Sequence, residues 1–222
     1  MNEQERTQRE IEAALAARFR MEQEMKLNNY RQLNAFVPKG GTLFTGSSLM
    51  ELFPIAEYCM DEGIPAVYNR GIGGYTTDDF LAAIGPMLLD PEPSRVFINI
   101  GTNDIREMPD GEDWFDHLSG NYRKICGIIR DRLPEAEVYM MAYYPVNPRG
   151  SSPALRVRTN EAVDRANGMV RRLAEEFGYR YIDVGGGLKD GEGNLRAEHT
   201  ADGIHFDAAA YRTVFDQLKQ YL

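Results

Sequence analysis

The chain has 222 residues, 43% of them hydrophobic and 27% charged, which is typical of a single soluble α/β domain with a sizeable core. Its formal net charge of −9 argues against nucleic acids and anionic membranes as partners, because both bind basic faces. No apolar run approaches membrane-spanning length, and the charged N-terminus lacks the apolar centre of a secretory signal. We therefore expect a cytoplasmic protein that binds neither nucleic acid nor membranes.

Residues 3–33 are predicted to form one amphipathic helix. Its apolar stripe consists of Ile11, Ala14, Leu15, Met25 and Leu33, with Phe19 at the edge. Such a stripe indicates packing on the domain or on a second copy, and so allows a homodimer through this helix; a cap over a substrate cleft is the less favoured alternative. Residues 38–41 (PKGG) break the pattern, so we separate a helical arm, residues 1–38, from a second unit, residues 39–222.

From Thr42 onward, short apolar runs alternate with amphipathic stretches of helical period. The apolar runs are residues 42–45, 66–68, 96–100, 138–141 and 181–184. The helix-like stretches cover residues 48–60, 76–86, 112–132, 158–177 and 207–221. This alternation predicts an α/β fold with a mainly parallel five-stranded sheet and helices on both faces. Ligands bind such sheets beyond the carboxyl ends of the strands, so chemistry is expected just after each apolar run.

Three of these positions carry suitable polar groups. Ser47 and Ser48 follow the first run in a strand-to-helix turn, where the helix start offers unpaired N–H groups beside a hydroxyl; a simple helix cap is the alternative. Residues 69–77 (NRGIGGYTT) follow the second run, and their glycines let backbone N–H groups approach a ligand. Asn103 and Asp104 follow the third run, and the Asn103 amide is a candidate donor to an oxyanion, or merely part of a capping turn.

The strongest candidate for a base is His205. Asp202 stands three residues before it, a spacing that brings both side chains to one side of a turn and lets the carboxylate orient the imidazole. His199 is a weaker candidate, and His117 is expected to be a surface or packing residue. Three histidines without an H-E-x-x-H motif argue against a metal site.

Cofactor and redox motifs are missing from the sequence. No G-x-x-x-x-G-K-[ST] phosphate loop occurs, and Thr76 stands where a dinucleotide-binding loop needs its third glycine. Cys59 and Cys126 form no CxxC pair, so we expect two buried free thiols. We therefore expect no cofactor and no metal.

Taken in order, four motifs resemble those of the SGNH, or GDSL-type, hydrolase family. They are FTGSSL (44–49), NRGIGGYTT (69–77), IGTND (100–104) and DGIHF (202–206). The resemblance covers roughly residues 42–222, leaves the N-terminal arm outside, and implies a three-layer α/β/α, flavodoxin-like fold. It also implies hydrolysis of esters or thioesters without a cofactor. The departure is Ser47, which replaces the usual aspartate of the first motif.

The resemblance also implies roles for particular residues. Ser48 would be the nucleophile, His205 the base and Asp202 its orienting acid. The oxyanion hole would consist of the Ser48 and Gly74 backbone N–H groups and the Asn103 side chain. Substrate contacts are predicted at Tyr75 and at Tyr144, in the loop after the fourth strand.

We therefore predict a serine esterase acting on a small acyl ester, such as an acetyl group on carbohydrate. Three alternatives stay open. An acyltransferase could use the same residues, a binding domain could keep the fold without catalysis, and a flavodoxin-like nucleotide binder would need a phosphate loop that the first turn does not supply.

Overall fold

The computed structural model describes residues 3–65 and 67–222; Ala66, which we expected in the second strand, lies outside the described residues. The strands are β1 (Thr42–Gly46), β2 (Val67–Gly71), β3 (Arg95–Asn99), β4 (Glu137–Met141) and β5 (Arg180–Ile182). The α-helices are α1 (Glu3–Leu33), α2 (Ser48–Glu51), α3 (Ile55–Asp61), α4 (Thr77–Ala82), α5 (Trp114–Arg132), α6 (Asn160–Phe177) and α7 (Ala208–Leu218).

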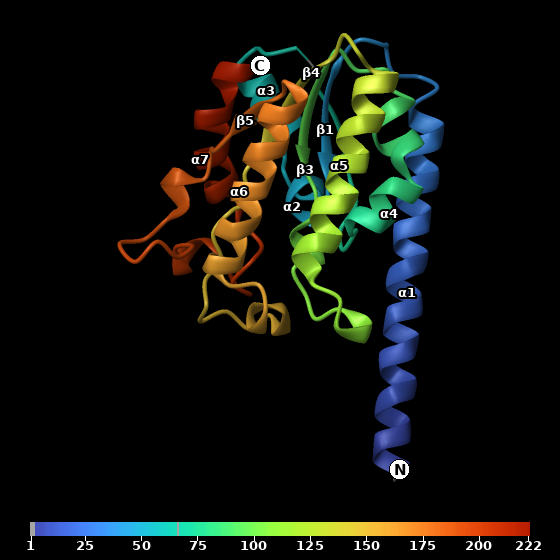
Figure 1. The fold of residues 1–222 in the computed structure, drawn as a ribbon, viewed down its shortest axis with the longest axis vertical. Helices are drawn as coiled ribbons and strands as arrows, with labels where there is room; N and C mark the ends of the chain where they lie inside the picture. The colour runs from blue at the N-terminus through green and yellow to red at the C-terminus, as the bar shows by residue number, and fades with distance from the viewer. Residues whose placement is uncertain (1–2, 66) are drawn as a thin grey trace.

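The five strands form one parallel sheet in the order β2-β1-β3-β4-β5 (Figure 1). The chain runs from β1 outward to β2 and then returns to the other side of β1, so the strand order reverses between β1 and β3. In open parallel sheets the ligand crevice lies at this reversal, beyond the carboxyl ends of the strands. The predicted parallel sheet and the N-terminal helix are confirmed.

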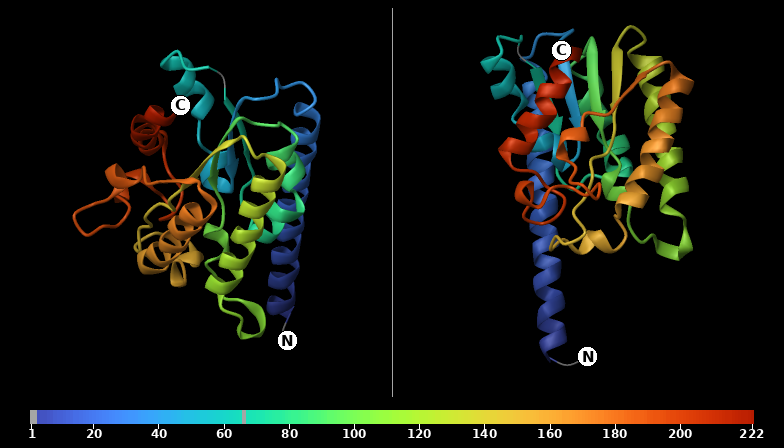
Figure 2. Two further views of the ribbon diagram at one scale, coloured as in Figure 1. Left: turned by 45° about the horizontal axis from the view of Figure 1, so that its top comes forward. Right: turned by 90° about the vertical axis from the view of Figure 1, so that its left-hand side faces the viewer.

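Helices cover both faces of the sheet, as Figure 2 shows with α5 and α6 on one side and α7 on the other. One core cluster joins α4, α5 and α6 to Leu43 and Val96, and a second joins α2, α3 and α7 to Phe44 and Phe97. Neighbouring residues of a strand point to opposite faces, which is why one apolar run supplies both clusters. On the second face Phe44, Phe97 and Tyr139 stack with ring centroids 4.6 Å apart at each step, and they tie three strands together.

Two predicted helices are interrupted. The stretch 48–60 is divided into α2 and α3, because Pro54 has no N–H to continue the first helix and instead begins the second. The stretch 76–86 ends as an α-helix at Ala82, and a π-helical turn follows at Gly85–Leu89. The break at Pro54 limits α2 to little more than one turn, and this short helix begins at Ser48 within the first motif.

Helix α1 extends well beyond the domain, and only its C-terminal part lies against it (Figure 1). The apolar stripe that we expected to pack on the domain is exposed, with Ile11 at 50% and Leu15 at 61% exposure, so this part of the prediction was wrong. Its packing on a second copy stays a prediction. The face that docks carries Gln23, Lys26, Leu27 and Tyr30. Three of these side chains bind backbone carbonyls or a carboxylate, which hydrophobic periodicity does not reveal.

Cys59 and Cys126 are buried free thiols, as expected. Burial raises the pKa of the Cys126 thiol to about 12, so it stays protonated and unreactive at neutral pH. Within the described part of the chain, no helix has the length and apolar character needed to cross a membrane.

Candidate active site

Ser48 forms a hydrogen-bonded chain with two side chains from the far end of the sequence, His205 and Asp202. The Oγ atom of Ser48, the first residue of α2, lies 2.9 Å from Nε2 of His205. The other ring nitrogen of His205, Nδ1, lies 2.6 Å from Oδ2 of Asp202. The structure thus brings the three predicted residues together at the carboxyl edge of the sheet.

The turn before Ser48 depends on close approach between strands. Gly46 has φ +152°, and a Cβ there would lie 2.0 Å from the carbonyl oxygen of Asn99. Only glycine fits this contact, so the chain can turn sharply from β1 into α2. Ser47 is 2% exposed, and its side chain makes no cap hydrogen bond, so Ser48 and not Ser47 presents its hydroxyl to the imidazole.

Asp202 is held as a carboxylate. Its Oδ1 accepts the backbone N–H groups of Ile204 at 2.9 Å and His205 at 2.8 Å. Burial raises the pKa of this carboxyl, but the two N–H donors and the imidazole outweigh burial and lower it to about 2. The carboxylate is therefore ionised at every pH at which the protein is expected to work, and the imidazole faces a permanent negative charge.

The glycine loop, which carries one predicted oxyanion donor, lies against Ser48: a Cβ at Gly73 would lie 3.6 Å from the Ser48 Cβ. Among the described residues, the backbone N–H groups of Ser48 and Gly74 have no protein acceptor. The Asn103 Nδ2 group donates to the carbonyl oxygen of Tyr75 at 3.0 Å, which uses one of its two hydrogens. Its Oδ1 accepts from Arg158 Nη2 at 3.1 Å, so the amide orientation is defined from both ends.

Residues on α1 and α2 hold the glycine loop, and sequence reasoning missed them. Gln23 Nε2 donates to the carbonyl oxygen of Gly73 at 2.7 Å. Glu51 Oε2 accepts the Gly73 N–H, and Glu51 Oε1 pairs with Lys26 Nζ, each at 2.5 Å. The Gly73 carbonyl belongs to the same peptide unit as the Gly74 N–H, so Gln23 orients this candidate donor. No local motif marks such contacts, because the partners are far apart in sequence.

The two predicted substrate contacts have different surroundings. Tyr75 is 7% exposed and lines a cavity of about 420 Å³ beside Gly74, between α1 and the glycine loop. Tyr144 is 4% exposed and packs edge-on against Phe206 with ring centroids 5.1 Å apart. Its placement on the cleft wall was wrong: the residue follows β4, but its ring turns into the second core cluster. The spare base, His199, pairs with Asp207 instead.

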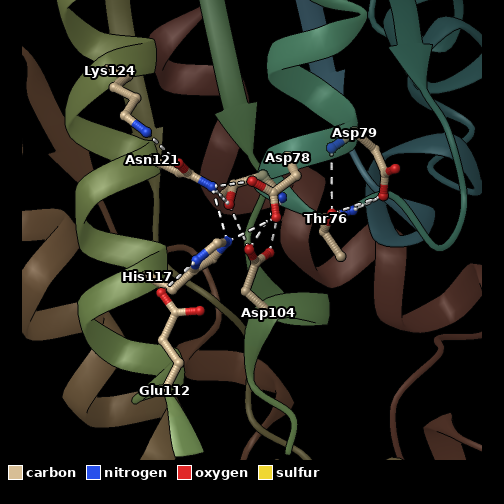
Figure 3. A network of polar contacts seen from close by, with 9 residues as sticks. Thr76, Asp78, Asp79, Asp104, Glu112, His117, Asn121 and Lys124 are labelled. Carbon is tan, nitrogen blue, oxygen red and sulfur yellow. Dashed lines mark hydrogen bonds and ion pairs between the residues drawn. The ribbon is translucent and has the colours of Figure 1, made fainter. Parts of the chain in front are cut away.

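A polar network joins the start of α4 to α5 and to the turn after β3 (Figure 3). Asp104, next to Asn103, is 2% exposed and accepts the Thr77 N–H at 3.0 Å and the Thr77 hydroxyl at 2.5 Å. It thereby joins the third motif to the second. His117 on α5 lies between two carboxylates, with Nε2 2.8 Å from Asp78 and Nδ1 3.1 Å from Glu112. His117 is thus a packing residue of this network, as expected.

This network predicts a pH-dependent stability. The hydrogen bond to Asp78 raises the pKa of His117 above its ordinary value of 6.5, burial opposes this, and Glu112 adds to it. The protonated ring therefore stabilises the fold fully below pH 6.5, and this contribution is lost as pH rises through the raised pKa. We expect a loss of up to about 1 kcal/mol, or roughly 2–4 °C in melting temperature. Melting curves of the wild type and His117→Gln across this range test it, since the variant should lack this slope; equal slopes would contradict it.

Among the residues that the structure describes, no group of three or more His, Cys, Asp or Glu side chains is arranged to hold a metal ion. The chemistry that these residues offer is that of a hydroxyl, an imidazole and a carboxylate in sequence, beside free N–H donors.

Comparison with known proteins assigns the chain to a family. The profile of the GDSL-like lipase/acylhydrolase family matches residues 55–213. A solved protein from Streptococcus pneumonia, whose name refers to platelet activating factor, is 29% identical with a TM-score of 0.84 over 94% of this chain and 96% of the other. A GDSL-like lipase from Bacteroides thetaiotaomicron, 20% identical, shares the fold with a TM-score of 0.73 over 88% of this chain and 96% of the other.

A curated relative is the N-acylneuraminate cytidylyltransferase of Escherichia coli O18:K1:H7 (strain RS218 / NMEC). It is 28% identical over 156 residues, which make up 69% of this chain and 34% of that protein. The chain thus spans about a third of the length of this relative. The profile spans the second, third and fourth sequence motifs, and the first motif, residues 44–49, lies before the matched range. The profile covers more than half of the sequence, so the chain belongs to the GDSL-like lipase/acylhydrolase family.

Proposed function

We propose that the protein is a serine ester hydrolase in which Ser48, His205 and Asp202 act as nucleophile, base and orienting acid. One observation carries the proposal: His205 Nε2 lies 2.9 Å from Ser48 Oγ while its Nδ1 lies 2.6 Å from an ionised Asp202. A serine hydroxyl is a weak nucleophile unless a base removes its proton, and this is the geometry in which an imidazole can do so.

In the proposed reaction, His205 takes the Ser48 proton while Oγ attacks the acyl carbon and the carbonyl oxygen becomes an oxyanion. The N–H donors of Ser48, Gly74 and Asn103 stabilise this oxygen, each contributing about 2.7–4 kcal/mol. The bond to the leaving alcohol then breaks, and His205 gives the alcohol its proton. Water attacks the acyl-enzyme in the same way, releases the acid and restores the serine.

The cavities beside the site favour a small acyl group. The cavities of about 310 and 420 Å³ are lined by residues of which at least half are polar or charged. The cavity of about 520 Å³ at Asp202 and His205 presents mainly apolar surface, but Phe206 is the one large apolar side chain among the described residues that line it. A long acyl chain needs an apolar groove to bind in, whereas a short one, such as acetyl, does not. The cytidylyltransferase activity of the curated relative is not part of the proposal, because most of that protein lies outside the match.

Covalent labelling tests the proposal directly. A fluorophosphonate reacts only with an activated serine, so we expect it to modify Ser48 and no other residue, as read by peptide mass spectrometry. A series of aryl esters of increasing acyl length should show the highest kcat/KM at acetyl. Labelling at another residue would refute the proposal. So would a protein that is not labelled and does not turn over any of the esters.

The contact between α1 and the glycine loop gives a further prediction. Gln23→Ala removes the donor that orients the Gly73–Gly74 peptide, so we expect kcat on an aryl acetate to fall roughly tenfold with KM little changed. Gln8→Ala is the matched control, because Gln8 lies on the same helix but is exposed and donates to Glu12 on that helix at 2.8 Å. Equal activity of the two variants would show that α1 does not support the donor.

A further inference from the structure

Arg158 carries a buried charge without a counter-ion. The residue is 7% exposed, and no carboxylate of the described residues lies within ion-pair distance of it. Among the residues that the structure describes, its side chain hydrogen-bonds to Asn103 alone, and its buried Nε has no partner. Burial lowers the pKa of this guanidinium to about 10, although the more distant carboxylates of Asp104 and Asp202 act to raise it. An unpaired buried charge is costly, and an anion supplied by a ligand offsets that cost.

Arg158 and the loop that precedes it contact two parts of the candidate active site, Asn103 and the turn that carries Asp202. Nη2 of Arg158 contacts the amide of Asn103, a candidate oxyanion donor. The loop that leads to it packs on the triad turn: Asn147 N donates to Gly203 O at 2.8 Å and Ser152 N donates to Asp202 O at 3.0 Å. A group bound by Arg158 therefore lies next to Asn103 and close to the turn that carries Asp202.

A cavity of about 310 Å³ opens beside this guanidinium. Arg106, Arg156 and Arg158 line it together with a single acidic residue, Glu107. None of the three arginines forms an ion pair with any described residue. In a chain with a net charge of −9, this is a local excess of positive charge. Arg106 also lines the cavity beside Gly74, but Glu24 and Asp79 balance the two arginines there, so the excess of positive charge belongs to the cavity at Arg158.

We propose that this cavity binds a carboxylate of the substrate, held by Arg158, so that the preferred substrate is an ester carried by a small carboxylic acid such as an acetylated acidic sugar. The planar guanidinium presents paired N–H groups that match the two oxygens of a carboxylate. That the substrate is an ester rests on the proposed function, whereas the carboxylate-binding site rests on Arg158 and the cavity that it lines.

Two substrates that differ only in the acid test the proposal. One is a methyl glucuronoside and the other a methyl glucoside, each carrying one acetyl group on the same hydroxyl, with acetate release as the readout. We expect the wild type to favour the acidic substrate in kcat/KM by roughly ten- to a hundredfold. Arg158→Gln should abolish this preference, and Arg158→Lys should retain part of it.

The ratio of kcat/KM on the two substrates distinguishes binding of the carboxylate by Arg158 from positioning of Asn103 by Arg158. If Arg158 only orients Asn103, then Arg158→Gln lowers both rates equally and the preference survives, which would overturn the proposal. Arg130→Gln is the control, because Arg130 is exposed near the end of α5 and pairs with Asp131. A glucose 6-phosphate bearing the same acetyl group forms the third arm, and a higher rate on it than on the uronate would overturn the carboxylate assignment.

A binding measurement makes the inference independent of turnover. In the Ser48→Ala protein, the acetylated glucuronoside should raise the melting temperature more than the acetylated glucoside does, and adding Arg158→Gln should remove the difference. Equal shifts would refute the carboxylate site while leaving the esterase proposal intact. Conversely, selective binding without hydrolysis by the wild type would refute the esterase proposal and leave the carboxylate site standing.

Discussion

Replacing Ser48 with alanine is expected to abolish ester hydrolysis, with kcat falling by roughly 10⁶-fold. The hydroxyl is the group that attacks in the proposed mechanism, and its oxygen lies 2.9 Å from Nε2 of His205, the base that would take its proton. Its loss should leave the fold intact, with the free energy of unfolding changed by less than about 1 kcal/mol. Initial rates on an aryl acetate and a melting curve of the same preparation measure both quantities.

Ser47→Ala is the matched control for this substitution. It removes a hydroxyl one residue away, from a side chain that is 2% exposed and makes no cap hydrogen bond. We expect Ser47→Ala to keep kcat within a few-fold of the wild type. If Ser48→Ala kept wild-type turnover, or if Ser47→Ala lost it instead, the nucleophile would be wrongly assigned.

Asp202→Asn is expected to lower kcat by roughly 10⁴-fold. The carboxylate accepts a hydrogen bond from Nδ1 of His205 at 2.6 Å, and so fixes Nε2 as the ring nitrogen that faces Ser48. It also stabilises the imidazolium that forms when the ring takes the serine proton. An asparagine has nearly the same shape but no charge, and its amide can orient the ring wrongly. The measurement is kcat on an aryl acetate across the neutral pH range.

The pH dependence sharpens this prediction. Because the pKa of Asp202 is lowered from 3.8 to about 2, its ionised form stabilises the fold above pH 3.8, and this contribution is lost as pH falls toward 2. The defect of Asp202→Asn should therefore persist at every neutral and alkaline pH. The control is Asp207→Asn, since Asp207 caps α7 through Ala210 N at 2.8 Å and should affect stability more than kcat. Recovery of Asp202→Asn by raising the pH would contradict the assigned role.

The chain's own pattern determined the fold and the main candidates of the site. Apolar runs alternating with helical stretches predict parallel strands, and parallel strands end at one common edge. Ser48 follows β1, Gly74 follows β2 and Asn103 follows β3, so these residues had to lie near one another once the sheet formed. Asp202 and His205 are three residues apart, and their pairing is a local property that the sequence itself displays.

Only the tertiary structure decided the contacts between distant elements. Gln23 reaches the peptide that carries the Gly74 N–H, and Arg158 reaches Asn103; neither residue stands in a motif. The side of the chain to which Tyr144 turns, and the face of α1 that docks, were likewise decided by packing. Periodicity reports which residues are apolar along one element, whereas a single polar side chain finds its partner only after the whole chain has folded, and that is why these residues were missed.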